Sequence, residues 1–160
     1  MAAEAGTVAL APGEGETLVN PVGGHVTFKA RGRETNGALT VLETVVTPGD
    51  GPPLHVHVKD DEAVYVLEGE IDFRVGDELY HNRAGSFVFI PRGVPHTFQN
   101  VGSEDGRMLL MFTPSGIERL FELAAASGAT SADDEGWASA ARAAATELVG
   151  QPLRRARTDS

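Results

Sequence analysis

Short β-rich runs separated by turn residues fill the sequence from residue 25 to residue 113. The runs cover 25–29, 38–47, 54–58, 63–68, 70–75, 86–90, 96–99 and 107–112. Glycine, proline, asparagine and aspartate lie between them, as in the segment Pro-Gly-Asp-Gly-Pro-Pro at 48–53. Many short strands without helices between them are typical of a sandwich or a barrel. The sequence therefore predicts an all-β fold for this region.

After Pro114 the apolar residues take up a helical period. The spacing i, i+3, i+4, i+7 is followed by Ile117, Leu120, Phe121 and Ala124. Gly128 is placed to end this helix. The apolar stripe must be buried, either on the chain's own barrel or on a partner chain.

A second helix is expected over about residues 133–149. Ser131 can cap it, Asp134 lies three residues further on, and Gly150 can end it. Residues 1–24, rich in glycine and alanine, are expected to form an N-terminal arm, and residues 151–160, with no apolar pattern, a disordered tail. The predicted organisation is a single barrel at 25–113, flanked by the arm and by a short helical appendage at 114–150.

The charge of the chain restricts its partners. With 13 basic and 23 acidic residues among 160, the formal net charge is −10. A field of this sign repels phosphate backbones and anionic membranes, so neither nucleic acid nor a membrane is expected as a partner. The sequence has no cysteine, which excludes disulfides and thiolate metal sites. No signal peptide or membrane span is recognisable, and a cytoplasmic location is expected.

Three side chains in the segment from Gly49 to Gly69 are suited to binding a metal ion. His55 and His57 are two residues apart in an extended run, so both imidazoles project from the same face of a strand. Glu62 follows after the polar segment 58–61, which can turn the chain. Glu62 can therefore begin the next strand and face back toward the two histidines.

A second segment, from Gly85 to Asn100, supplies a third imidazole. Pro91 and Gly93 suit a type I turn, and Pro95 fixes the backbone just before His96. Three imidazoles and one carboxylate suit Fe, Mn, Ni, Co, Cu or Zn better than Mg or Ca, which prefer oxygen ligands. An octahedral ion held by four side chains keeps two positions open for water, dioxygen or a substrate oxygen.

The two segments together resemble the cupin superfamily. The first cupin motif is reproduced in full by Gly49-x5-His55-x-His57-x4-Glu62-x6-Gly69. The second is reproduced in full by Gly85-x5-Pro91-x-Gly93-x2-His96-x3-Asn100. Residues 36–118 also resemble the small single-barrel cupins of the cupin 2 type grouped as quercetin-dioxygenase-like, through Gly51-Pro-Pro-Leu-His-Val-His57 and Phe112-Thr-Pro-Ser-Gly116.

This resemblance implies a jelly-roll barrel, the double-stranded β-helix, with one divalent metal ion held by His55, His57, Glu62 and His96. In flavonol dioxygenases of this kind the motif glutamate also takes a proton from the substrate, so Glu62 would be ligand and base together. Cupin barrels of this size often pair by exchanging N-terminal strands, which implies a homodimer. The leading interpretation is a metal-dependent dioxygenase acting on a small enolic or phenolic compound. A non-catalytic small-molecule or metal-binding module and a metal-dependent isomerase or epimerase remain open.

Strand alternation also predicts apolar neighbours for the ligands. Val64 and Val66 share the face of Glu62, and Phe98 shares the face of His96. These three side chains are candidates for the wall of a substrate pocket, and ordinary barrel filling is the alternative. Trp137, on the second predicted helix, is interpreted as an anchor that docks the helix rather than as a substrate platform.

Overall fold

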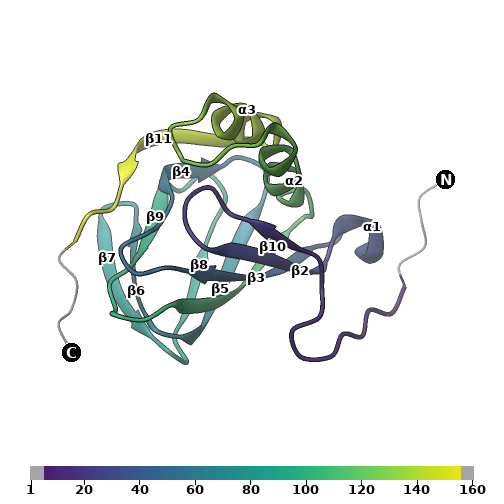
Figure 1. Ribbon diagram of the computed structural model, residues 1–160, viewed down its shortest axis with the longest axis horizontal. Helices are drawn as coiled ribbons and strands as arrows, with labels where there is room; N and C mark the ends of the chain where they lie inside the picture. Colours follow the sequence, from purple (N-terminus) through teal and green to yellow (C-terminus); the bar gives the residue numbers. More distant parts are fainter. Residues whose placement is uncertain (1–5, 156–160) are drawn as a thin grey trace.

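Two antiparallel sheets face each other in the computed structural model, which describes residues 6–155 (Figure 1). The six-stranded sheet has the order β1 (Thr17–Val19), β2 (His25–Ala30), β3 (Thr40–Val46), β10 (Gly106–Thr113), β5 (Asp61–Glu68) and β8 (Phe87–Ile90). The five-stranded sheet has the order β11 (Thr146–Pro152), β4 (Pro53–His57), β9 (His96–Asn100), β6 (Glu70–Val75) and β7 (Glu78–Arg83). The expected all-β jelly-roll barrel is confirmed.

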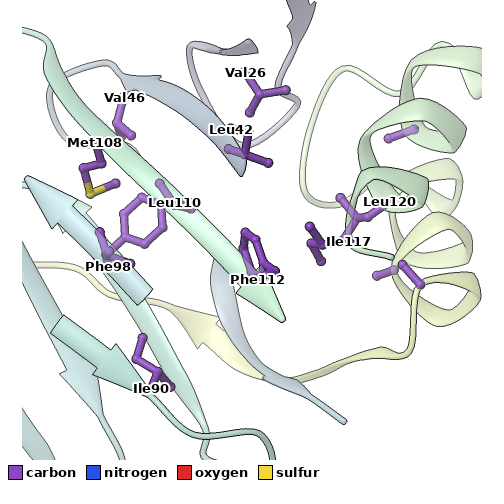
Figure 2. Close-up of a cluster of buried hydrophobic side chains, with 14 of the residues drawn as sticks. Val26, Leu42, Val46, Ile90, Phe98, Met108, Leu110, Phe112, Ile117 and Leu120 are labelled. Atoms are coloured by element: carbon purple, nitrogen blue, oxygen red, sulfur yellow. The ribbon is translucent and has the colours of Figure 1, made fainter. Parts of the chain in front are cut away.

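The core lies between the sheets, and alternation is clear along β10. Along β10, Met108, Leu110 and Phe112 are buried, and the residues between them are partly exposed. Burying one such side chain contributes about 1.5–3 kcal/mol. Figure 2 shows Phe112 at the end of β10, facing Ile117 and Leu120 of the helical segment. The core therefore continues from the barrel interior to the helices.

The first predicted helix is confirmed as α2 (Glu118–Ser127), which ends at Gly128 in the left-handed conformation. Its apolar residues Leu120 and Ala124 are buried within the same chain. The stripe thus requires no partner chain to cover it.

The homodimer stays a prediction, and light scattering that shows a monomer at micromolar concentration would refute it. Among residues 6–155, no helix is both long and apolar enough to cross a bilayer.

The second predicted helix is wrong in its C-terminal part. α3 spans Glu135–Ala143 and is preceded by Asp134 rather than by Ser131 at the N-cap position. Ala145 has a positive φ of 53°, and from Thr146 the chain runs as β11, paired with β4. The left-handed residue that ends a helix is usually glycine, so the alanine at this position did not indicate from the sequence that the helix ends here. α3 lies beside α2 over one end of the barrel, with β11 next to it (Figure 1).

Both predicted chain ends are more ordered than expected. Part of the N-terminal arm forms β1, which pairs with β2. The short helix α1 (Gly32–Thr35) lies beyond the arm, inside the region predicted as strands only. At the other end, the predicted tail begins inside β11. Arg155 donates its backbone N–H to Gln99 Oε1 at 2.7 Å, and its Nε lies 2.8 Å from Asp72 Oδ2. Residues 1–5 of the arm and 156–160 of the tail lie outside the described residues.

Glu118, the first residue of α2, ties the helix to the barrel. Its carboxylate accepts hydrogen bonds from the backbone N–H groups of Gly32 and Gly116, both at 2.9 Å, and from the Thr40 hydroxyl. Burial alone would raise the pKa of Glu118, but these hydrogen bonds lower it below the usual value of a glutamate. The ionised carboxylate therefore stabilises the folded state.

We expect Glu118→Gln to lower the free energy of unfolding at pH 7 by about 1–3 kcal/mol, because an amide accepts hydrogen bonds at only one of its two ends. A carboxylate whose pKa is lowered by folding contributes its full stabilisation above the pKa of about 4.3 that it has in the unfolded chain. This stabilisation is lost as the pH falls through the lower pKa of the folded state. The gap between parent and variant should thus narrow in acid. Urea unfolding of parent and variant at pH 7 and in acid measures this difference in the free energy of unfolding, and Glu78→Gln at an exposed position is the control. A gap independent of pH would contradict the role of the charge.

Candidate metal centre

Three strands from the two sheets bring the four predicted ligands together. His55 and His57 project from the same face of β4, and His96 on β9 lies directly across from His55. Glu62 is the second residue of β5, in the opposite sheet. All four side chains are buried, and one ligand atom from each lies within 4.8 Å of the others. The structure thus brings the four predicted ligands together.

Turns at the mouth of the barrel fix the direction of these strands. A bend after β4 reverses the chain, so that Glu62 faces the histidines as predicted. Gly93 donates its N–H to the His57 carbonyl at 2.8 Å, which ties the second motif to the first. The turn differs from the prediction. The Val94 N–H donates a hydrogen bond to the Pro91 carbonyl at 3.3 Å, and Gly93 has a φ of 82° within this turn. This conformation favours glycine and belongs to a type II rather than a type I turn.

Each imidazole is held through its Nδ1 atom. His55 Nδ1 lies 2.7 Å from the Pro53 carbonyl, and His96 Nδ1 lies 2.9 Å from the Val94 carbonyl. His57 Nδ1 lies 3.1 Å from the hydroxyl of Thr146. A carbonyl only accepts hydrogen bonds, so His55 and His96 carry a proton on Nδ1. In the neutral rings, Nε2 then holds the free lone pair, which is the usual arrangement in metal-ligating histidines.

The carboxylate of Glu62 is the electrostatic centre of the cluster. Its Oε2 lies 2.8 Å from His96 Nε2 and 3.3 Å from His57 Nε2. Burial would raise the pKa of Glu62, but the hydrogen bonds to His57 and His96 lower it well below the usual range. Burial lowers the pKa of His55 strongly, and the neighbouring rings of His96 and His57 lower it further. For His96, burial lowers the pKa but contact with Glu62 reverses the effect and raises it.

These contacts fit a bound cation. A carboxylate oxygen and an imidazole lone pair repel each other at 2.8 Å unless a proton or a metal ion lies between them. A metal ion among three imidazoles and one carboxylate satisfies all four donors at once, whereas a proton satisfies two. Nitrogen-rich donor sets of this kind select transition metals and zinc over calcium and magnesium. His55, His57, Glu62 and His96 are therefore a set of four buried residues that could bind a divalent metal ion.

An apolar cavity adjoins the four residues and extends toward the helices. Its volume is about 60 Å³. Strands of both sheets, α2 and α3 line it. Its apolar walls include Val26, Leu42, Phe98, Leu110, Phe112, Ile117, Leu120 and Trp137, and His55, His57 and Glu62 line its polar end.

The predicted pocket residues divide into two groups. Phe98 lines the cavity, as predicted. Val64 and Val66 face the barrel interior on the same side of β5 as Glu62, but they are fully buried in the core and are not part of the cavity wall in the described structure. The cavity extends from the ligands toward the helices, whereas these valines lie further along β5. Trp137 docks α3 as expected and also lines the cavity, which the sequence interpretation did not favour.

Two residues at the site were missed from the sequence. Thr146 holds His57 from β11, a strand that was predicted as helix; the β-prone run Thr-Glu-Leu-Val at 146–149 was the available signal. Asp60 is 5% exposed, and its Oδ2 lies 3.8 Å from His57 Nδ1. Burial raises the pKa of Asp60. In the sequence, Asp60 lies in the polar segment between His57 and Glu62, and this position indicated only a turn residue.

Comparison with known proteins identifies relatives over the same region. Polyketide synthase CurC of Streptomyces cyaneus is 34% identical over 70 residues, which are 44% of this chain and 46% of that protein. Quercetin 2,3-dioxygenase of Bacillus subtilis is 34% identical over 91 residues, 56% of this chain and 26% of the enzyme. An uncharacterized Streptomyces coelicolor protein is 34% identical over 101 residues, 63% of this chain and 89% of that protein. The chain thus spans less than half the length of the first two relatives.

Solved structures agree with the fold. KdgF from Halomonas sp. superposes with a TM-score of 0.59 at 19% identity, over 68% of this chain and 94% of that one. Oxalate oxidase in complex with glycolate gives a TM-score of 0.53 at 26% identity, over 63% and 56% of the two chains. The family model described as the cupin domain matches residues 42–112, a segment that contains all four clustered side chains. The two complete motifs, the barrel and this match together show that the chain belongs to the cupin family.

Proposed function

We propose that this cupin binds one divalent transition metal ion through His55, His57, Glu62 and His96 and uses it to oxygenate a small enolic or phenolic compound. The observation that carries the proposal is the position of the buried donor set, three members of which line the polar end of a mostly apolar cavity. A redox-active metal with open coordination positions supplies binding and activation of oxygen and of a substrate oxygen.

The chain's own residues supply three further requirements. The hydrogen-bonded Nδ1 atoms of His55, His57 and His96 hold the imidazoles in one orientation. Glu62 is a buried carboxylate at the polar end of the cavity and can accept a proton from a substrate hydroxyl. The apolar walls exclude bulk water, which protects reactive species and strengthens electrostatic interactions.

Cavity size narrows the substrate class. At about 60 Å³ the cavity is smaller than the roughly 150 Å³ that holds one benzene ring, so even a one-ring compound needs the walls to move, and a compound with several rings needs a larger movement. The relative named quercetin 2,3-dioxygenase supports oxygenation as the reaction type, and the chain matches 26% of that enzyme. We therefore propose a substrate smaller than a flavonol, with an ionisable hydroxyl that can approach both the metal and Glu62.

The test begins with elemental analysis of protein purified without a metal-affinity tag. Protein reconstituted separately with Fe, Mn, Ni, Co or Cu is then screened for oxygen uptake with a panel of phenols and diketones. Zinc-reconstituted protein is the matched control, because zinc has no redox chemistry. We expect uptake with at least one redox metal and none with zinc. Binding of panel compounds without uptake for every metal would favour the binding module, and rearranged product without uptake, also with zinc, would favour the isomerase.

A further inference from the structure

The indole N–H of Trp137 is a buried hydrogen-bond donor without a partner in the described structure. The side chain is 4% exposed, and its Nε1 atom is shielded from solvent. An indole nitrogen only donates, and a buried donor left unpaired is costly to the fold. Natural proteins rarely keep such a group unless something outside the chain satisfies it.

Two other buried side-chain atoms lack a hydrogen bond among the described residues, but both face an oppositely charged or basic group. Arg31 Nε lies 3.0 Å from Glu122 Oε1, and Asp60 Oδ2 lies 3.8 Å from His57 Nδ1. Each therefore has electrostatic compensation within the protein. Trp137 has neither an ion pair nor a hydrogen bond, which sets it apart from both.

Trp137 also contributes to the wall of the cavity beside the clustered residues. It lines the same cavity as His55, His57 and Glu62, on the side formed by the helices. The hydroxyl of Thr146 is already engaged by His57, and that of Thr44 donates to the His25 carbonyl at 3.3 Å. Asn20 also lines the cavity, and its Oδ1 accepts a hydrogen bond from the Val22 N–H at 3.3 Å. The indole N–H thus belongs to a residue of the cavity wall and is a buried donor without a partner among the described residues.

We propose that Trp137 donates a hydrogen bond through Nε1 to an oxygen acceptor of the small molecule bound in this cavity. The inference rests on the proposed function to the extent that the cavity is the ligand site. It adds a specificity determinant: the preferred ligand carries a carbonyl, ether or hydroxyl oxygen directed toward α3, in addition to the oxygen that faces the metal. Trp137 is then a substrate-positioning residue as well as the anchor of its helix.

Because Trp137 is the single tryptophan of the chain, its indole N–H gives one signal in a ¹H–¹⁵N spectrum. Zinc-reconstituted protein, which is diamagnetic and does not turn over, is titrated with phenol, catechol and acetylacetone. We expect the indole proton to move downfield with at least one of these probes. An indole signal that stays in place with all three overturns the proposal, and this measurement needs no variant.

A matched replacement tests the donor alone. A tryptophan auxotroph can incorporate benzothienylalanine, which keeps the two-ring shape but has sulfur in place of N–H, and Trp137→Phe removes the donor genetically. Both should bind the probe that shifts the indole signal about 5- to 30-fold more weakly, a loss typical of one hydrogen bond left unmade. The benzothienyl protein should keep the thermal stability of the ligand-free parent, because the N–H makes no internal bond.

The outcomes separate this inference from the proposed function. If the benzothienyl protein binds the probe as tightly as the parent does, Trp137 acts by packing only and the inference is wrong, even where Trp137→Phe binds weakly. If the indole signal shifts but no redox metal supports oxygen uptake, the donor assignment stands and the oxygenase proposal fails. If oxygen uptake is found and kcat and KM are unchanged in the benzothienyl protein, the oxygenase stands and the donor assignment fails.

Discussion

Replacing His57 with alanine is expected to remove most of the bound metal while leaving the barrel folded. The imidazole supplies one of four donor atoms that lie within 4.8 Å of one another. Loss of a direct ligand should weaken metal binding at least as much as loss of a supporting hydrogen bond, which typically costs about 10- to 100-fold. We therefore expect metal content after dialysis to fall to less than about a tenth of the parent's.

The measurement is elemental analysis of dialysed protein, with circular dichroism to confirm the β fold. His25→Ala is the matched control, because His25 lies on β2, away from the cluster. Thr146→Val provides an intermediate step: it keeps the shape of the side chain but removes the hydroxyl that holds His57 Nδ1. If His57→Ala and Glu62→Ala proteins both retain as much metal as the parent, the metal site is wrongly assigned.

The four clustered residues could be predicted because their arrangement depends on local geometry. The i, i+2 spacing of His55 and His57 fixes their common face whatever the rest of the fold does. The polar segment before Glu62 and the turn before His96 are short, so the sequence largely determines where the chain reverses. A constellation that rests on strand alternation and tight turns needs little tertiary information.

The segment from Ala144 to Pro152 was mispredicted because long-range pairing determines its structure. The alanines before Thr146 favour a helix, and nothing in the sequence marks Ala145 as the residue with positive φ. The strand forms because Thr146 and Leu148 pair with His57 and His55 on β4. The β-prone run at 146–149 could have indicated a strand, but only its pairing with β4 places the Thr146 hydroxyl beside His57.

The cavity was beyond sequence reasoning for a related reason. Alternation correctly placed Val64, Val66 and Phe98 on inward faces, but it carries no information on where the barrel interior is filled and where it is hollow. The hollow part is set by the way α2 and α3 pack over the end of the barrel. Whether an amphipathic helix such as α3 presents Trp137 to a cavity or to a filled core depends on that packing.

Changing Glu62 to glutamine is expected to separate metal binding from catalysis. The amide keeps the size of the side chain and one oxygen donor, and the three histidines are untouched, so part of the metal should remain bound. The amide has no basic carboxylate to accept a substrate proton. General-base catalysis contributes about 10²- to 10⁴-fold, and we therefore expect kcat for oxygen uptake, per bound metal ion, to fall by at least about 100-fold.

Oxygen uptake at saturating metal, normalised to metal content, measures this effect, and Glu78→Gln at an exposed position of β7 is the matched control. Normalisation matters because Glu62 is proposed as both ligand and base, and a simple loss of metal would lower total activity without changing the activity per ion. A variant that loses only occupancy would therefore show Glu62 to be a ligand alone. Parent and Glu62→Gln proteins with equal kcat toward the same substrate would refute the base assignment and leave the metal site intact. A fall in kcat with the metal still bound would instead show that the buried carboxylate takes part in the chemistry, as expected if it removes the hydroxyl proton of the substrate.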